Sequence, residues 1–159
     1  MTARPKILIA EDETLVRLDL RALLEDAGFE VCAEARDGQE AVDLAREQQP
    51  DVALLDVKMP RLDGIEAARR ILAERWIPIV ILTAYGYGEL ISRALDTGVF
   101  GYIVKPFRPE DVVQAVRAAA ERREMTVDLA SADGRSTWPL SFVRRPDGRL
   151  DVTLREDAP

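Results

Sequence analysis

The stretch PDVALLDVKMPRLDG, residues 50–64, contains the pattern from which the fold of this chain is most directly inferred. Residues 52–55 form a continuous apolar run after a turn residue, which is typical of a strand buried on both faces. An aspartate, Asp56, stands at the end of this run, and Asp63-Gly64 follows a few residues later. Burial penalises a charged carboxylate, so the position of Asp56 requires compensation by other groups.

Outward from residues 50–64, short apolar runs alternate with amphipathic stretches. The apolar runs predict strands at residues 6–10, 30–35, 52–56, 78–83 and 102–104. Helical spacing predicts helices over residues 38–48, 64–74, 89–97 and 110–124, and a first helix that runs through Leu15, Leu18, Leu23 and Leu24 and ends at Gly28. Thr14, Asp37 and Asp63 are predicted helix caps, and Pro109 lies near a first turn. This alternation predicts an α/β fold, a doubly wound five-stranded parallel sheet with helices on both faces.

Composition and charge narrow the class of protein. The 159 residues are 47% hydrophobic and 32% charged, which is typical of a globular domain, and the net charge of −7 argues against a basic nucleic-acid-binding surface. We expect no membrane span and no secretory signal, since the apolar runs are short. Cys32 is the one cysteine, so we expect no internal disulfide and a cytoplasmic location. The chain has no histidine, so phosphohistidine chemistry would require a partner protein.

Residues 125–159 differ in pattern from the preceding part. Two Asp-Gly pairs, at residues 133–134 and 147–148, are typical of hairpin turns. Around them, apolar residues alternate at Trp138, Leu140 and Phe142 and again at Leu150, Val152 and Leu154. This predicts a β-hairpin or a three-stranded meander in which Pro139 favours an edge strand, with a partly ordered extension as the alternative. We therefore predict two units, residues 1–124 and a short β-rich extension of residues 125–159.

Polar residues follow the predicted strands at the edge where doubly wound sheets bind ligands. They are Glu11-Asp12 after the first strand, Asp56 at the end of the third, Thr83-Ala84 at the fourth and Lys105-Pro106 at the fifth. Three carboxylates in one pocket repel one another unless a cation compensates them, and oxygen ligands of this kind suit Mg²⁺. A lysine and a hydroxyl beside that cation would complete a phosphate-binding site.

Each of these motifs alone also has a structural explanation. Glu11-Asp12 is a favourable acidic start to a helix, Thr83 can satisfy backbone groups at a strand end, and Lys105-Pro106 can form a turn. Asp63-Gly64 is most simply a helix cap followed by a position where a side chain does not fit. These explanations do not account for all the motifs occurring together, each at the end of its own strand.

Taken together, the motifs resemble the receiver domain of bacterial two-component response regulators. The resemblance rests on Glu11-Asp12, on Asp56 within LLDVKMPRLDG, on Thr83-Ala84 within ILTAY and on Lys105-Pro106 within YIVKPF. It covers residues 6–124 and implies a flavodoxin-like or CheY-like sheet with strand order 2-1-3-4-5. The wording is most similar to antiterminator-type (ANTAR-like) regulators, although no helical RNA-binding domain is recognisable after residue 124.

The resemblance implies a mechanism of phosphorylation. Asp56 would accept a phosphoryl group from a sensor histidine kinase, and Mg²⁺ would be held by Glu11, Asp12, Asp56 and the backbone carbonyl of Lys58. The phosphoryl group would contact Lys105, the Thr83 hydroxyl and the Ala84 N–H, Tyr102 would act as a switch, and Pro60, Gly64 and Pro106 would be structural. The chain would assist its own phosphotransfer and dephosphorylation without being an enzyme. A bulky Tyr85 would lengthen the phosphorylated state.

Two hypotheses remain for the output. In the first, the surface formed by residues 89–97, the fifth strand and the last helix signals to a downstream protein partner or forms a homodimer. In the second, the chain is a transcriptional antitermination or DNA-binding regulator whose nucleic-acid-binding element is diverged or lost. A receiver-like fold that is never phosphorylated is disfavoured, because every residue of the acceptor site is present.

Overall fold

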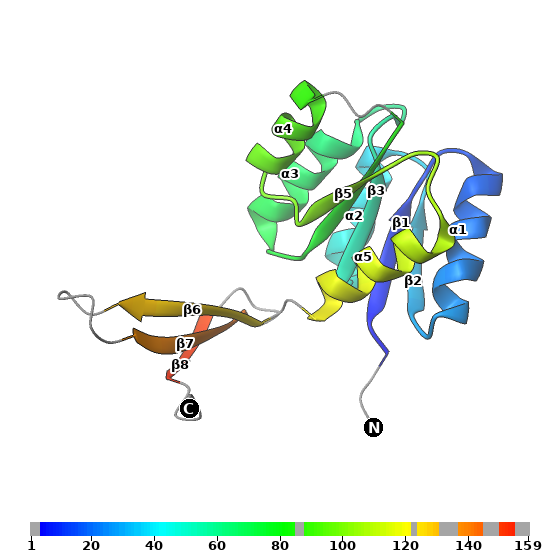
Figure 1. The fold of residues 1–159 in the computed structure, drawn as a ribbon. Coiled ribbons are helices and arrows are strands. Elements are labelled where there is room, and N and C mark those ends of the chain that lie inside the picture. Colours follow the sequence, from blue (N-terminus) through cyan, green and yellow to red (C-terminus); the bar gives the residue numbers. More distant parts are fainter. Residues whose placement is uncertain (1–3, 85–87, 122–123, 131–136, 145–149, 155–159) are drawn as a thin grey trace.

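The computed structural model describes residues 4–84, 88–121, 124–130, 137–144 and 150–154 (Figure 1). The first five strands are β1 Lys6–Ala10, β2 Glu30–Ala35, β3 Val52–Asp56, β4 Ile79–Thr83 and β5 Gly101–Val104. The helices are α1 Thr14–Asp26, α2 Gly38–Gln48, α3 Gly64–Glu74, α4 Gly88–Asp96 and α5 Pro109–Glu121. Most boundaries agree with the predicted ones to within a residue or two, but α5 ends at Glu121 and Glu124 begins a further strand.

Strands β1 to β5 form one parallel sheet in the order β2-β1-β3-β4-β5, which confirms the predicted fold class. Figure 1 shows α1 and α5 on one face of this sheet and α2, α3 and α4 on the other. Each face has its own apolar core. On the α1/α5 face the core includes Leu20, Leu24, Val112 and Val116, and on the opposite face it includes Val42, Ala68, Ile71 and Ala94.

Two of the three predicted side-chain caps are confirmed. Asp37 and Asp63 precede α2 and α3, and each carboxylate accepts a hydrogen bond at 2.8 Å from the backbone N–H three residues later. The cap predicted at Thr14 is wrong, since Thr14 is already helical and Glu13 occupies the cap position without a side-chain bond. The Glu13 N–H instead donates to the carboxylate of Glu11 at 3.2 Å, so the start of α1 is tied to the acidic pair.

Helix α1 buries a face other than the one that its leucines suggest. Leu15 is 78% exposed and Leu18 is also exposed, whereas Arg17, Leu20 and Leu24 are buried against the sheet. The leucine pattern therefore predicts the helix correctly but not its orientation. A charged residue, Arg17, occupies the first position of the buried stripe.

The remaining strands, β6 Glu124–Ala130, β7 Thr137–Arg144 and β8 Leu150–Leu154, form a separate antiparallel sheet. The order β6-β7-β8 is that of a meander, and both Asp-Gly pairs lie outside the described residues. Strand β7 is central, so the edge position predicted from Pro139 is wrong for the strand as a whole. Within the described residues, Pro139 pairs with Asp128 of β6, and the pairing of β7 with β8 begins at Leu140.

The division of the chain after residue 124 stays a prediction. Among the helices of the described residues, none has both the length and the apolar character needed to cross a membrane.

Candidate functional site

Three carboxylates meet at the carboxyl edge of the parallel sheet. Glu11 and Asp12 follow β1, and Asp56 is the last residue of the neighbouring strand β3. One carboxylate oxygen from each lies within 4.8 Å of the other two. Glu11 and Asp56 are buried and Asp12 is exposed, so the cluster is closed on the protein side and open to solvent on the other.

Lys105 brings one positive charge to these carboxylates. It follows β5, two strands away from β3, and its long side chain reaches across the end of β4. The Nζ atom lies 3.2 Å from an oxygen of Glu11 and 3.3 Å from an oxygen of Asp56. The Lys105 backbone N–H donates to the Thr83 carbonyl at 2.7 Å, which holds the start of this loop against β4.

The charges of this cluster are strongly coupled. Burial, and secondly the charge of Asp56, raise the pKa of Glu11 to about 7. Burial also raises the pKa of Asp56, although Lys105 opposes the shift. For Lys105, burial lowers the pKa, but the charges of Asp56 and Glu11 more than offset this and the net shift is upward. The Lys105 ammonium group therefore does not prevent Glu11 from holding a proton near neutral pH.

This shortage of positive charge fits a divalent cation. The donors are carboxylate oxygens, which Mg²⁺ prefers, and the exposed side of the cluster leaves room for water and phosphate ligands. Glu11, Asp12 and Asp56 are the residues that would hold the ion. The carbonyl of Lys58, which is predicted as a further ligand, lies in the loop directly after β3, and the Lys58 side chain is exposed.

The predicted phosphate-binding residues lie beside Asp56. In the register of β3 and β4, Asp56 pairs with Leu82, so Thr83 lies one residue beyond it on the adjacent strand. Thr83 is buried, and Ala84, the next residue, is exposed. Tyr102 lies on β5 opposite Ile81 and is 43% exposed. Tyr85 lies outside the described residues.

Two glycines allow close packing around the loop that follows Asp56. A Cβ atom on Gly64 would lie 1.9 Å from the Asp56 carbonyl oxygen, and the Gly64 N–H donates to the Val57 carbonyl at 2.8 Å. This gives the physical reason why a side chain does not fit at Gly64. A Cβ atom on Gly38, at the start of α2, would lie 2.1 Å from the Leu62 carbonyl oxygen. Sequence reasoning missed this second close approach, because it joins two segments that are distant in the chain.

The prolines expected to be structural also lie in loops at this edge. The Pro60 carbonyl accepts a hydrogen bond from the Leu62 N–H at 2.8 Å, which forms a turn in the β3–α3 loop. Pro106 follows a cis peptide bond with Lys105.

The raised pKa values predict how stability depends on pH without metal. On unfolding, the pKa of Glu11 falls from about 7 to its ordinary value of 4.5, so Glu11 releases its proton at pH values between the two. The pKa of Asp56 is also raised in the folded protein and falls on unfolding. Stability in EDTA should therefore decrease as pH rises from 4.5 to about 7, by up to about 3 kcal/mol from Glu11. Glu66, whose pKa is lowered to about 2 mainly by Arg69, changes stability only below this window.

Urea unfolding in EDTA at several pH values between 4.5 and 7.5 measures this dependence. The Glu11→Gln variant is the control, since it should flatten the decrease. Saturating Mg²⁺ should also reverse the decrease, because metal binding favours the deprotonated carboxylates. Equal pH profiles for Glu11→Gln and the parent would contradict the assignment of the proton to Glu11.

Residues 7–117 match the family model of the response regulator receiver domain. The chain belongs to the response regulator receiver family. It is 50% identical over 122 residues to the transcriptional regulatory protein PdtaR of Mycobacterium tuberculosis, which covers 76% of this chain and 60% of PdtaR. The chain therefore spans less than two thirds of the length of that relative.

Solved receiver structures share the fold. The signal receiver domain of NarL from Mycobacterium tuberculosis superposes with a TM-score of 0.73 at 28% identity, covering 76% of this receiver chain and 98% of that domain. A chain of the CheX–CheY complex with BeF₃ and Mg²⁺ from Borrelia burgdorferi superposes with a TM-score of 0.69 at 28% identity, covering 71% and 87%. These similarities place the chain among two-component response regulators.

Proposed function

We propose that Asp56 accepts a phosphoryl group from a phosphohistidine of a sensor histidine kinase. The observation that carries this proposal is the position of Asp56, a buried carboxylate within 3.3 Å of Lys105 and beside Glu11 and Asp12. A carboxylate oxygen of Asp56 forms a bond to phosphorus, and the P–N bond of the phosphohistidine breaks. The electron pair stays on the imidazole nitrogen, and the imidazole comes from the partner because this chain has no histidine.

The surrounding residues of the chain position and neutralise charge. Lys105 pairs with Asp56 and Glu11 in this structure. Once Asp56 is phosphorylated, the Lys105 ammonium group would pair with the phosphoryl oxygens, which then carry the negative charge. Glu11, Asp12, Asp56 and the Lys58 carbonyl would hold Mg²⁺, which supplies neutralisation of the phosphoryl charge when bound. The Thr83 hydroxyl and the Ala84 N–H donate hydrogen bonds to the phosphoryl oxygens. The chain is thus a phosphoacceptor that assists its own phosphorylation and dephosphorylation, and we assign it to the cytoplasm.

The output surface in this proposal is formed by α4, β5 and α5. Tyr102 and Val104 on β5 and Leu95 on α4 are exposed apolar or aromatic side chains of this surface. Phosphorylation would draw Thr83 towards the phosphoryl group, and Tyr102 would turn inward from its exposed position. A downstream protein partner or a second copy of the chain would bind the altered surface.

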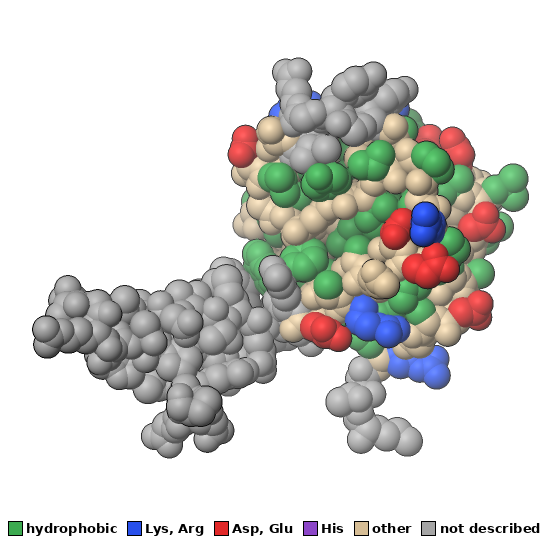
Figure 2. All heavy atoms as spheres, viewed as in Figure 1, with side chains coloured by type: hydrophobic (Ala, Val, Ile, Leu, Met, Phe, Trp, Pro, Cys, Tyr) green, Lys and Arg blue, Asp and Glu red, His purple; other side chains and the backbone are tan. Residues whose placement is uncertain are grey.

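A nucleic-acid output is the second candidate, because PdtaR is named a transcriptional regulatory protein. The charge distribution does not favour it. The net charge is −7, and on the face drawn in Figure 2 the described acidic and basic side chains are interspersed with hydrophobic ones. A gel-shift assay with RNA and DNA decides the question: phosphorylation-dependent, salt-sensitive binding by the full chain would support this second output.

The experiment that tests phosphoryl acceptance uses a small phosphodonor such as acetyl phosphate. The parent protein should gain the mass of one phosphoryl group in Mg²⁺ and not in EDTA. Treatment with hydroxylamine should remove the group, as expected for an acyl phosphate, and peptide mapping should locate it within residues 50–64. Uptake that is unaffected by EDTA, or a group that resists hydroxylamine, would contradict the proposal.

A further inference from the structure

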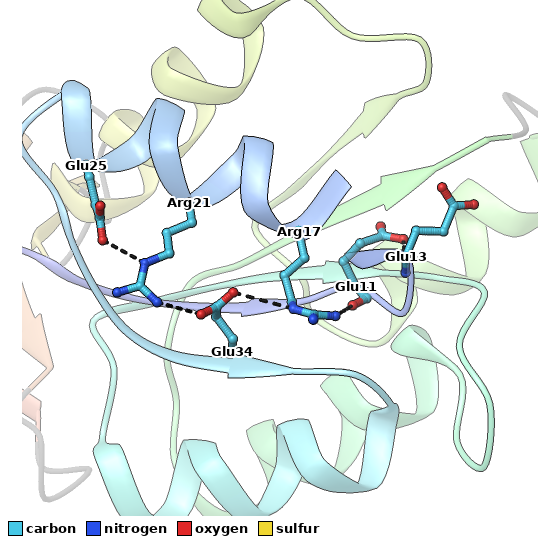
Figure 3. A network of polar contacts seen from close by, with 6 residues as sticks. All are labelled: Glu11, Glu13, Arg17, Arg21, Glu25 and Glu34. Carbon is cyan, nitrogen blue, oxygen red and sulfur yellow. Dashed lines mark hydrogen bonds and ion pairs between the residues drawn. The ribbon is translucent and has the colours of Figure 1, made fainter. Parts of the chain in front are cut away.

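A buried arginine lies beneath the acidic pair. Arg17 of α1 is 6% exposed, on the same helix face as the apolar core residues Leu20 and Leu24. Its Nη1 donates a hydrogen bond at 2.9 Å to the backbone carbonyl of Glu11, and its Nε lies 3.4 Å from a carboxylate oxygen of Glu34 on β2 (Figure 3). A guanidinium group is rarely buried unless it is paired, so these contacts explain why a charge is tolerated here.

The ion pair between Arg17 and Glu34 belongs to a larger network of polar contacts, which is shown in Figure 3. The second oxygen of Glu34 accepts a hydrogen bond from Arg21 at 2.6 Å, and Arg21 also donates to Glu25 at 2.9 Å. The Arg21 side chain is partly exposed, and none of its contacts in the described residues involves Glu11 or Asp12. The two arginines thus share Glu34, but Arg17 alone joins it to Glu11.

An irregularity in β2 is what directs Glu34 towards α1. Ile7 pairs with Val31, but Leu8 pairs with Ala33, so Cys32 is an extra residue in β2. Its thiol donates to the Ile7 carbonyl at 3.5 Å. Side chains alternate between the faces of a sheet, so the extra residue shifts the phase by one and places Glu34 on the α1 face.

The Glu11 carbonyl belongs to the peptide that joins the two acidic residues. The N–H of Glu11 donates to the Ala35 carbonyl at 3.0 Å, so β2 holds one side of the residue. The Arg17 bond holds the carbonyl on the other side. Rotation of the peptide between Glu11 and Asp12 would break that bond and change the direction of the Asp12 carboxylate, which is the exposed member of the cluster.

We propose that Arg17, held by Glu34, is a positioning residue for the metal site. Its guanidinium group orients the peptide between Glu11 and Asp12 so that both carboxylates face Asp56. This inference rests on the proposed function, in which the acidic cluster binds Mg²⁺. Residues that orient metal ligands in this way typically change metal affinity by 10- to 100-fold when they are substituted.

The experiment compares Arg17→Lys and Arg17→Met with the matched control Arg21→Gln in the full chain. Arg21→Gln removes a contact to the same Glu34 but none to Glu11. Mg²⁺ affinity is measured by isothermal titration calorimetry. We expect a dissociation constant about tenfold or more above the parent value for both Arg17 variants, and less than about twofold for Arg21→Gln.

Urea unfolding with and without Mg²⁺ separates positioning from simple stability. A purely structural role would lower stability equally in EDTA and in Mg²⁺. A positioning role reduces the increment that Mg²⁺ adds, by about 1.4 kcal/mol for each tenfold loss of affinity. An unchanged increment and parent-like affinity in folded Arg17→Lys would overturn the inference. If Arg17→Met does not fold, Arg17→Lys and Glu34→Gln supply the same comparison, and parent-like affinity in both again overturns it.

Failure of the inference is distinguishable from failure of the proposed function. If the parent protein binds no Mg²⁺, or binds it equally well after Asp12→Asn, the acidic cluster is not the metal site and the proposed function is contradicted. If the parent binds Mg²⁺ and Asp12→Asn abolishes binding, the metal site stands. Equal affinities of Arg17→Lys, Arg21→Gln and the parent would then contradict only the role of Arg17.

Discussion

Asp56→Asn protein is expected to take up no phosphoryl group from acetyl phosphate under conditions in which the parent protein is fully labelled. Asparagine has nearly the same shape but no anionic oxygen, so the nucleophile is lost while the pocket keeps its form. The same change should not destabilise the protein in EDTA. Burial raises the pKa of Asp56, so its charge opposes folding at neutral pH, and a neutral amide removes that opposition. Mass spectrometry and urea unfolding measure the two effects.

Asp63→Asn is the matched control for this experiment. Asp63 is a carboxylate in the same loop, but it caps α3 and accepts from the Glu66 N–H. Asparagine is an equally good cap, so labelling should remain at the parent level and stability should change little. Labelling of Asp56→Asn at the parent rate would show that another residue is the acceptor.

Gly64→Ala is expected to cost about 3 kcal/mol or more of stability and to abolish most phosphorylation. The added Cβ would lie 1.9 Å from the Asp56 carbonyl oxygen, and this neighbour is backbone at the end of a central strand rather than a flexible side chain. Relief of the overlap requires either the end of β3 or the start of α3 to move. Movement of the end of β3 displaces the Asp56 carboxylate from Lys105, and movement of the start of α3 distorts the loop that carries the Lys58 carbonyl.

Gly101→Ala provides the comparison for that variant. Gly101 lies on β5, and a Cβ atom built there meets no atom within 4 Å, so alanine should be accepted with parent-like unfolding and labelling. Urea unfolding and the rate of labelling are measured for both variants. Parent-like stability and labelling of Gly64→Ala would mean that the loop can adjust to the added methyl group and that the close approach of Gly64 to the Asp56 carbonyl is not needed for phosphorylation.

The sheet and most of the acidic pocket could be predicted because they follow from local pattern and one topological rule. The apolar run of β3 identifies a buried strand, and parallel strands bring their carboxyl ends to one edge. Glu11, Asp56 and Lys105 each lie at the carboxyl end of a strand, so their meeting can be predicted without knowledge of side-chain packing. The same reasoning places Thr83 beside Asp56.

The support beneath the pocket could not be predicted in this way. The leucines of α1 suggest a buried face through Leu15 and Leu18, whereas packing against the sheet selects Arg17, Leu20 and Leu24. Regular alternation in β2 would place Glu34 on the wrong face, and only the extra residue at Cys32 corrects this. Such a shift of register depends on contacts between strands. An arginine at helical spacing from Leu20 and Leu24 was the signal available in the sequence.

The segment between β3 and α3 packs closely against the first turns of both α2 and α3. Gly38 belongs to α2 and Gly64 to α3, and neither position has room for a methyl group. If this segment were replaced by the corresponding segment of another family member, the first turns of both α2 and α3 would have to be replaced with it. Lys58 lies in the same segment with an exposed side chain and is not among the atoms nearest to either glycine, so a single replacement of its side chain should leave this close packing intact.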